Sequence, residues 1–398
     1  MNSPRRIAEP EFIALVAMLF ATIAFSIDAM LPALTEIGEQ LSPNAPENAT
    51  LIVGIFVLGM GVGTFFTGPL SDAFGRKPVI LGGFALYLAG ALWAGLSNDL
   101  NWILAGRFIQ GLAAAGPRIA GVAMVRDLYS GERMASIMSF AMTVFALVPA
   151  VAPVIGQAIM IAAGWRAIFF AFAIFGVMVG LWVAFRQPET LKPEDRRPLS
   201  ISKVWRAVIE SFSNRVFSYS VATQTMAYTA LFAMISLIQP IYAQSFGIEE
   251  KFPLFFAAAA LLSIPASIIN GRMVLRLGMR KLIKSALIGQ ILVSTIAISL
   301  WYTGNMTVWV FFVWATSLLF SIGFIFGNLN ALALEPLGHI AGMASSISSS
   351  LATVVSALLA IPISLSFDGT PQALLIGALI CWVISLILML RLGPRPAV

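Results

Sequence analysis

Long apolar runs separated by short polar connections occupy almost the whole chain. A membrane-spanning helix needs about 20 predominantly apolar residues, and runs of that length predict twelve transmembrane helices. Their expected ranges are 11–33, 50–69, 78–97, 101–125, 133–160, 165–186, 213–243, 252–271, 281–302, 306–330, 340–366 and 371–391. Pro or Gly interrupts some runs, which membrane helices tolerate when neighbouring groups satisfy the backbone. The pattern therefore predicts an all-α membrane protein.

The organisation of the first half is repeated in the second. A charged elbow, Gly68-Pro-Leu-Ser-Asp-Ala-Phe-Gly-Arg-Lys77, follows the second run, and a similar segment, Gly271-Arg-Met-Val-Leu-Arg-Leu-Gly278, follows the eighth run 203 positions later. Matched loops in two halves indicate a duplicated membrane protein. One long polar stretch, from Arg186 to Arg215, lies between the sixth and seventh runs. We therefore expect two pseudo-symmetric six-helix bundles, with domains 1–186, a cytoplasmic linker 187–212, and 213–398.

Composition supports a lipid environment. Hydrophobic residues make up 59% of the chain and charged residues 11%, whereas soluble domains contain about 25% charged residues. One aqueous core cannot bury that much apolar surface, so we expect the lipid bilayer as the solvent. The net charge of +6 is better explained by topology than by nucleic-acid binding.

The basic residues predict the orientation. With the N-terminus in the cytoplasm, twenty of the 24 Lys and Arg residues fall in inside loops, only Arg166 and Lys251 fall outside, and Arg107 and Arg118 fall within a span. Arg5, Arg6, Arg197 and Arg395 are among the inside group. By the positive-inside rule, both termini are expected in the cytoplasm.

Several kinds of chemistry are excluded by residue content. The single cysteine, Cys381, lies in an apolar run and rules out disulfides and cysteine metal sites. The single histidine, His339, lies in a connection and is assigned no role. No phosphate-binding glycine loop and no catalytic constellation stand out. We expect no cofactor, no metal and no enzymatic activity, and transport energy from an ion gradient rather than ATP.

Four motifs resemble those of one transporter family. The elbow, Gly68 to Lys77, resembles the loop motif of the major facilitator superfamily, and Arg107-Phe-Ile-Gln110-Gly111 resembles its R-x-x-Q-G motif. Asp28-x-x-Leu31-Pro32-Ala33 is similar to the D-x-x-L-P-A pattern of drug:proton antiporters of the Bcr/CflA type. Pro149-x-x-x-Pro153-x-x-Gly156 approximates the antiporter motif G-P-x-x-G-G, but Ala152 and Gln157 depart from it.

The resemblance covers essentially the whole chain and implies a function. It implies the major facilitator fold, a small-molecule substrate near the midplane between the halves, exchange with protons, and the bacterial cytoplasmic membrane. It also implies gating roles for Pro153 and Gly156. The departure at Ala152 and Gln157 leaves transport better supported than antiport.

Asp28 and Arg107 are candidates for proton coupling, since ionisable residues within spans mark functional sites by default. Each lies five or six residues from the outer end of its span, roughly 8–9 Å deep. We expect them to pair when Asp28 is ionised and to separate when it is protonated. The alternatives are a static ion pair between two helices, or an Asp28 hydrated at the outer mouth.

Arg118 extends a basic stripe along the fourth span. It follows Arg107 by eleven residues, which at 100° per residue returns it to within about 20° of the same face. Gly111 and Ala114 lie on this stripe and leave room for a ligand. Arg107, Gln110 and Arg118 are thus candidate substrate contacts. Alternatively, Arg118 extends to the inner surface or pairs with a cytoplasmic carboxylate. In the cavity, it would favour anionic or dipolar substrates.

The second half offers uncharged polar candidates. Substrate contacts are predicted at Gln224, Tyr228, Gln239 and Asn328, near aromatic residues that suit a mixed apolar ligand. The alternative is hydrogen bonding between helices, common for polar residues in membranes. That alternative is preferred for the eleventh-span residues Ser346, Ser349, Thr353 and Ser356.

The elbow has a predicted mechanical role. Gly68 and Gly75 permit close packing and a tight turn, and Arg76 is expected to pair with Asp127. Asp72 is expected to meet the positive N-terminus of a neighbouring helix, which the resemblance implies is the start of the eleventh span. Such contacts between the halves would hold the outward-open state. The alternative is a positive-inside anchor for Arg76 and Lys77. The second copy has Leu275 in place of Asp72, so the latch is asymmetric.

These observations predict a monomeric proton-coupled transporter that exports small amphipathic compounds or drugs by alternating access. The alternative is a facilitator for a specific anionic or zwitterionic metabolite, without proton coupling. A membrane sensor that has lost transport is a third reading, disfavoured because Asp28 and Asp72 are both present.

Overall fold

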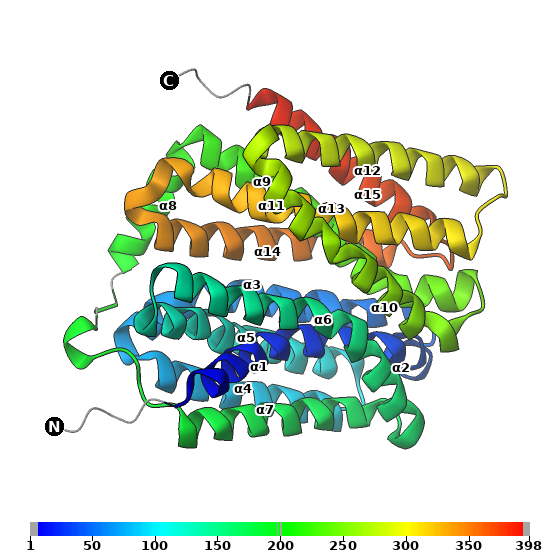
Figure 1. Ribbon diagram of the computed structural model, residues 1–398. Helices are drawn as coiled ribbons and strands as arrows, with labels where there is room; N and C mark the ends of the chain where they lie inside the picture. The colour runs from blue at the N-terminus through cyan, green and yellow to red at the C-terminus, as the bar shows by residue number, and fades with distance from the viewer. Residues whose placement is uncertain (1–6, 197, 200, 393–398) are drawn as a thin grey trace. The chain divides into compact units, whose positions relative to one another are not determined.

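The computed structural model describes residues 7–196, 198–199 and 201–392, and within them it contains helices and no strand. Arg5, Arg6, Arg197 and Arg395, which the charge analysis counted, lie outside these residues. The chain divides into two compact units, Met1–Ser200 and Ile201–Val398. Figure 1 shows the helices of each unit running alongside one another.

The N-terminal unit contains six long helices. Its helices are α1 (Glu9–Asp28), η1 (Leu31–Ala33), α2 (Leu34–Leu41), η2 (Pro46–Thr50), α3 (Leu51–Phe74), α4 (Arg76–Leu96), α5 (Leu100–Leu128), α6 (Gly131–Ala163), α7 (Arg166–Arg186) and η3 (Pro193–Asp195).

The C-terminal unit also contains a short helix before its first span. Its helices are α8 (Ile201–Ser213), α9 (Arg215–Pro240), η4 (Ile241–Ser245), η5 (Glu249–Lys251), α10 (Phe252–Ser263), α11 (Pro265–Leu277), α12 (Met279–Tyr302), α13 (Val308–Leu334), η6 (Glu335–Ile340), α14 (Ala341–Leu365) and α15 (Gln372–Arg391).

The described helices confirm a multi-pass membrane protein. Eleven continuous helical stretches of the described chain are long and apolar enough to cross a membrane. The longest, Val308–Leu365, has 58 residues and would measure about 87 Å as one helix, nearly three times the hydrocarbon core of a bilayer. It contains α13 and α14, and Leu337 between them leaves the helical conformation with φ −119° and ψ 31°. Counting these as two spans gives the predicted twelve.

Three local features were not predicted. The short helix α2 extends the first span, α8 forms within the expected linker 187–212, and the eighth span is divided into α10 and α11. The division falls at Pro265, which lacks the amide hydrogen that a continuous helix needs. Along the sequence, the boundary between the two units follows residue 200, inside the expected linker.

Helix packing repeats between the units. In the N-terminal unit α5 packs against α1, α3 and α4, α1 also packs against α6 and α7, and α4 packs against α7. In the C-terminal unit α13 packs against α9, α10, α11 and α12, α9 also packs against α14 and α15, and α12 packs against α15. The two sets correspond helix for helix, as expected for a duplicated fold.

Small residues bring α3 and α5 together. A side chain at Gly59 or Gly63 would overlap backbone atoms of α5, and one at Gly111 would overlap the carbonyl group of Phe56. Membrane helices associate through such close packing because lipid offers no hydrophobic driving force between them. The close contact positions the Arg107 face of α5 against α3.

Candidate functional site

Arg107 is completely buried between three helices. Its Nε donates to the carbonyl oxygen of Ile52 at 3.2 Å, and its Nη2 donates to that of Ser26 at 2.9 Å. Its Nη1 donates to Oε1 of Gln110 at 2.7 Å. The guanidinium carbon also lies 4.3 Å from the ring centre of Phe56. These contacts satisfy the cation without a carboxylate.

The position of Ser26 in α1 explains why its carbonyl oxygen is free to accept from Arg107. Ser26 lies in the last turn of α1, which ends at Asp28, and carbonyl groups in a last turn lack intrahelical donors. These carbonyls form the negative end of the helix dipole. Arg107 therefore caps α1 from a neighbouring helix.

Asp28 is buried beside this contact, with 4% of its surface exposed. The expected ion pair between Asp28 and Arg107 is absent from this structure, because the donors of Arg107 are directed at Ile52, Ser26 and Gln110. Over the described chain, no hydrogen bond or ion pair to the Asp28 carboxylate is found. Both groups are buried in the same unit, and Arg107 contacts α1 at Ser26, two residues before Asp28. Pairing of Arg107 with an ionised Asp28 stays a prediction.

Two further polar residues complete this site. The hydroxyl groups of Ser26 and Tyr87 share a hydrogen bond of 2.5 Å, and Ser26 also donates to the carbonyl oxygen of Thr22 at 2.6 Å. Tyr87 on α4 is fully buried. Sequence reasoning missed both residues. The available signal was a lone tyrosine among the apolar residues of the third span.

The side chain of Gln110 is hydrogen-bonded to Arg107. Its side-chain oxygen accepts from the guanidinium, while its Nε2 has no hydrogen-bond partner among the described residues. The expected substrate role of Gln110 therefore rests on this nitrogen.

The α6 motif contacts the segment that follows Asp28. Gly156 packs on Ala29, where an added Cβ would overlap the carbonyl group, and Pro153 lies within the same helix. The absence of a side chain at Gly156 thus allows α6 to reach the end of α1. Gating by Pro153 and Gly156 stays a prediction.

Arg118 is half-buried on α5. No ion pair or hydrogen bond of its side chain is found among the described residues, so the alternative of a pair with a cytoplasmic carboxylate is not seen there. It lies on the same face as Gly111, the face that contacts α3.

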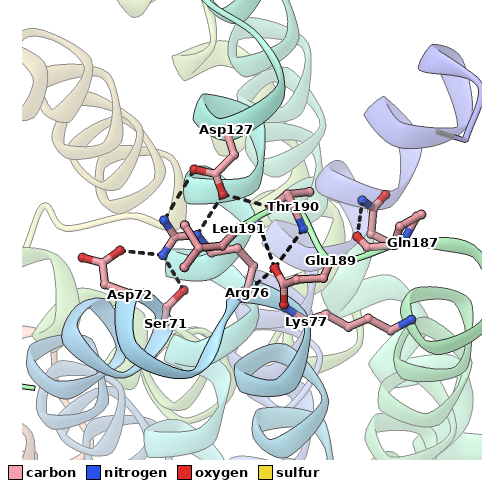
Figure 2. A network of polar contacts seen from close by, with 10 residues as sticks. Ser71, Asp72, Arg76, Lys77, Asp127, Gln187, Glu189, Thr190 and Leu191 are labelled. Carbon is pink, nitrogen blue, oxygen red and sulfur yellow. Dashed lines mark hydrogen bonds and ion pairs between the residues drawn. The ribbon is translucent and has the colours of Figure 1, made fainter. Parts of the chain in front are cut away.

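The elbow forms a polar network around Arg76 (Figure 2). Nη1 of Arg76 lies 2.6 Å from the carboxylate of Asp72, and Nε of Arg76 lies 2.9 Å from that of Asp127. Nη1 also donates to Ser71 at 3.1 Å. The predicted Arg76–Asp127 pair is therefore present, but both residues belong to the N-terminal unit, so this pair is not itself a contact between the halves.

The turn differs from the expectation at one glycine. Gly68 is helical, because α3 continues to Phe74, and the chain turns at Gly75 alone. Gly75 has φ 104°, a conformation that favours glycine. The contact of Asp72 with the eleventh span stays a prediction.

Glu189, from the expected linker, caps α4 (Figure 2). Its carboxylate accepts from the backbone nitrogens of Arg76 at 3.0 Å and Lys77 at 3.1 Å, and from those of Thr190 and Leu191. The first amide groups of a helix lack intrahelical acceptors, and a carboxylate there also complements the helix dipole. Sequence reasoning missed Glu189, because no spacing relates it to the elbow 113 residues earlier.

The C-terminal unit brings some of its candidates together. Gln224 donates to the hydroxyl of Tyr228 at 3.4 Å and accepts from Ser348 at 3.3 Å. The ring centres of Tyr228 and Phe326 are 4.3 Å apart. Gln224 and Tyr228 thus form a partly apolar cluster of α9, α13 and α14.

Other candidates make separate contacts. Asn328 donates to Asn270 of α11 at 2.7 Å, and Gln239 donates to Glu249 at 3.2 Å. Gln290, which sequence reasoning missed, is buried on α12 and donates to Ser317 and Ser321 of α13. The structure does not bring Asn328 or Gln239 into the Gln224–Tyr228 cluster. The described residues contain no group of three or more His, Cys, Asp or Glu that could hold a metal ion.

Comparisons with known proteins agree with this architecture. A model described as Major Facilitator Superfamily matches residues 13–361. A bicyclomycin resistance protein homolog of Haemophilus influenzae is 31% identical over 388 residues, covering 94% of each chain. The multidrug resistance protein MdtL of Salmonella heidelberg is 29% identical over 375 residues, covering 94% of this chain and 92% of that one.

A solved structure shares the fold. The xylose transporter XylE from E. coli, in a partially occluded inward-open conformation, aligns with a TM-score of 0.75, 10% identity, and coverage of 97% of this chain and 98% of that one. We conclude that the chain belongs to the Major Facilitator Superfamily and, within it, to the group of the Bcr/CflA type.

Proposed function

We propose that this protein is a proton-coupled secondary transporter that exports small amphipathic compounds across the bacterial cytoplasmic membrane by alternating access. The observation that carries the proposal is the buried Asp28, which has no partner among the described residues and lies beside the Arg107 contact with α1. The printed names of two relatives, which refer to bicyclomycin and multidrug resistance, support the substrate class.

Proton coupling is assigned to Asp28 and Arg107. Burial of an ionised carboxylate without a partner is costly, so we assign this arrangement to the proton-loaded form. When Asp28 loses its proton, its negative charge attracts the guanidinium and competes with the Ser26 carbonyl for it. Because Arg107 also holds Ile52 of α3, that competition changes the packing of α1 against α3 and α5.

Substrate contacts are assigned to both units. In the N-terminal unit they are Arg107, Gln110 through its Nε2, and Arg118. In the C-terminal unit Gln224 and Tyr228 are the strongest candidates because they form one partly apolar cluster. Gln239 and Asn328 are weaker, since each is bonded to another helix or turn.

The topology is part of the proposal. The charge distribution supports an orientation with both termini and the loop between α3 and α4 in the cytoplasm.

A second candidate is a facilitator for an anionic or zwitterionic metabolite. It is favoured by Arg118, a half-buried cation that has no ion-pair partner in the described chain. An organic anion would bind this cation more readily than a lipophilic cation would.

The test is transport in proteoliposomes under an imposed pH gradient. The probes are a lipophilic cation, a neutral antibiotic and an organic anion. We expect proton-driven accumulation of the cation or the antibiotic, and we expect Asp28→Asn to abolish it while substrate exchange without a gradient continues. The matched control is Asp195→Asn, since Asp195 is exposed in the linker.

Two outcomes would contradict the proposal. Full proton-coupled transport by Asp28→Asn would remove the coupling role. Transport of the anion alone, lost in Arg118→Gln and indifferent to the pH gradient, would establish the metabolite facilitator instead.

A further inference from the structure

The short helix α8 has a large apolar stripe that the protein does not cover. Trp205 is 64% exposed, Ile209 54% and Phe212 37%. At 100° per residue these positions fall within about 60° of one another on the helix. They therefore form a single continuous apolar stripe.

The rest of α8 is divided between protein and polar residues. Ala207 and Ser211 are buried, and α8 packs against α9 and α14. Ser202, Arg206, Glu210 and Ser213 are exposed and occupy the remaining arc. A helix that contacted only protein and water would not need three large apolar side chains in its uncovered stripe. The stripe therefore indicates a third, apolar environment beside α8, in addition to protein and water.

The position of α8 along the chain identifies the third environment. Asn214 follows α8 directly and caps α9, where its side chain accepts from the backbone nitrogens of Val216 and Phe217. The ring of Phe212 packs edge-on against that of Phe217, with centres 5.2 Å apart. Since α9 is a candidate membrane span that begins at Arg215, the stripe starts at a membrane surface.

The charges of α8 indicate the kind of lipid. Arg206 is exposed on the polar arc, and Arg215 lies at the start of α9, where it donates to the carbonyl oxygen of Arg391 at 2.8 Å. The single acidic residue of α8, Glu210, is held at 2.5 Å from Nε2 of His339. Basic residues next to Trp and aliphatic residues are typical of helices that lie in the interface of anionic membranes.

We propose that α8 lies in the inner surface of the membrane and binds anionic phospholipid headgroups. Trp205, Ile209 and Phe212 enter the boundary between headgroups and acyl chains, and Arg206 contacts lipid phosphate. The choice of the inner leaflet rests on the topology under the proposed function, whereas insertion into lipid does not. Because α8 packs on α9 and α14, the lipid composition bears directly on two spans of the C-terminal unit.

The test uses fluorescent labels in nanodiscs that hold one copy of the full chain. Cys381 is the only cysteine, so C381A provides a background for single introduced cysteines. I209C reports on the stripe and S213C on the polar arc, and I296C, in the exposed part of a span, is the lipid reference. W205C is the second reporter if I209C fails to fold. Each labelled protein is placed in phosphatidylcholine discs with and without phosphatidylglycerol.

We expect the label at I209C to be blue-shifted and several-fold less quenched by iodide than the label at S213C, approaching the I296C label. Phosphatidylglycerol should increase the protection, and R206Q should remove that increase. Equal quenching at I209C and S213C would overturn the proposal. Protection seen only in discs with two copies would assign the stripe to self-association, and protection without any lipid dependence would remove the headgroup site; both outcomes also overturn it. None of these readouts depends on transport, so a failed transport assay leaves the test intact.

Discussion

Arg107 connects three helices through a single side chain. It extends from α5 to the last turn of α1 at Ser26 and to the first turn of α3 at Ile52. Any displacement of α1 must carry this contact along or break it. Asp28 lies two residues beyond Ser26, so a change in its charge acts directly on the element that Arg107 holds.

The first prediction concerns the hydroxyl of Tyr87. Tyr87→Phe removes the 2.5 Å hydrogen bond to Ser26, and the net value of one such bond is about 1 kcal/mol. We expect a small loss of thermal stability but a clear change in the pH profile of transport, because Ser26 supports the Arg107 contact beside Asp28. The measurement is substrate-induced proton release in proteoliposomes across a pH series.

The same bond can be removed from the other side. Ser26→Ala should change the pH profile in the same direction. The double variant should change it no further, since both substitutions remove the same hydrogen bond between Ser26 and Tyr87. Tyr302→Phe is the control, because Tyr302 is 65% exposed. A wild-type pH profile with reduced stability would limit Tyr87 to a structural role.

At the scale of elements, the elbow joins parts of the chain that are distant in sequence. Arg76 brings together the end of α3 at Asp72 and the end of α5 at Asp127, and Glu189 adds the segment after α7. Thr190 closes the network by donating to Asp127 at 2.9 Å. The end of α3, the start of α4 and the end of α5 therefore form one bonded structure.

Glu189→Ala should weaken this structure. The substitution leaves the amide groups of Arg76 and Lys77 without their acceptor, and loss of a helix cap costs about 0.5–2 kcal/mol. We expect a lower unfolding temperature, by several degrees, together with slower turnover. Thermal unfolding in detergent and transport rates provide the measurements.

A neighbouring carboxylate provides the control for this prediction. Glu194→Ala should change stability by less than about 0.5 kcal/mol, because the Glu194 side chain is 74% exposed and lies 3.7 Å from Lys192. Gly75→Ala should reproduce the defect, since its Cβ would lie 2.5 Å from the Glu189 carboxylate at φ 104°. Equal stability of Glu189→Ala and Glu194→Ala would show that the cap is dispensable.

Hydropathy predicted the twelve spans because a bilayer imposes one length and one composition on every crossing helix. It did not predict α8, which has 13 residues and an apolar stripe rather than an apolar run. Motif reasoning found Asp28, Arg107, Arg76 and Asp127. It placed Arg107 opposite a carboxylate because carbonyl partners, unlike side chains, leave no mark in a sequence.

At the scale of the whole molecule, the two units repeat the same helix packing but differ in the charged residues that their spans contain. The N-terminal unit has Asp28, Arg107 and Arg118 within its spans, whereas the candidate cluster of the C-terminal unit is built from neutral Gln224 and Tyr228. The elbows differ in the same way, since Leu275 occupies the position of Asp72. Charge-dependent steps are thus expected from the first half.

Asp72→Ala tests the predicted latch. A contact present in only one conformational state changes the equilibrium between states rather than the intrinsic affinity for a ligand. We expect turnover to fall about tenfold or more while ligand affinity stays nearly constant. Transport rates and equilibrium binding to the same purified protein measure the two quantities.

The second elbow supplies the matched variant. Leu275→Ala should leave turnover unchanged, because Leu275 is 88% exposed and carries no charge. Loss of affinity in Asp72→Ala with a normal turnover rate would count against the latch.

The division of the eighth span has a consequence for stiffness. In the first repeat α3 is one continuous helix locked to α5 through Gly59, Gly63 and Gly111, so it resists bending. In the second repeat α10 and α11 form one helical stretch, in which Ile264 keeps helical angles (φ −54°, ψ −43°) but Pro265 lacks a backbone hydrogen-bond donor. We therefore expect this span to bend more readily near Pro265 than α3 does along its contact with α5.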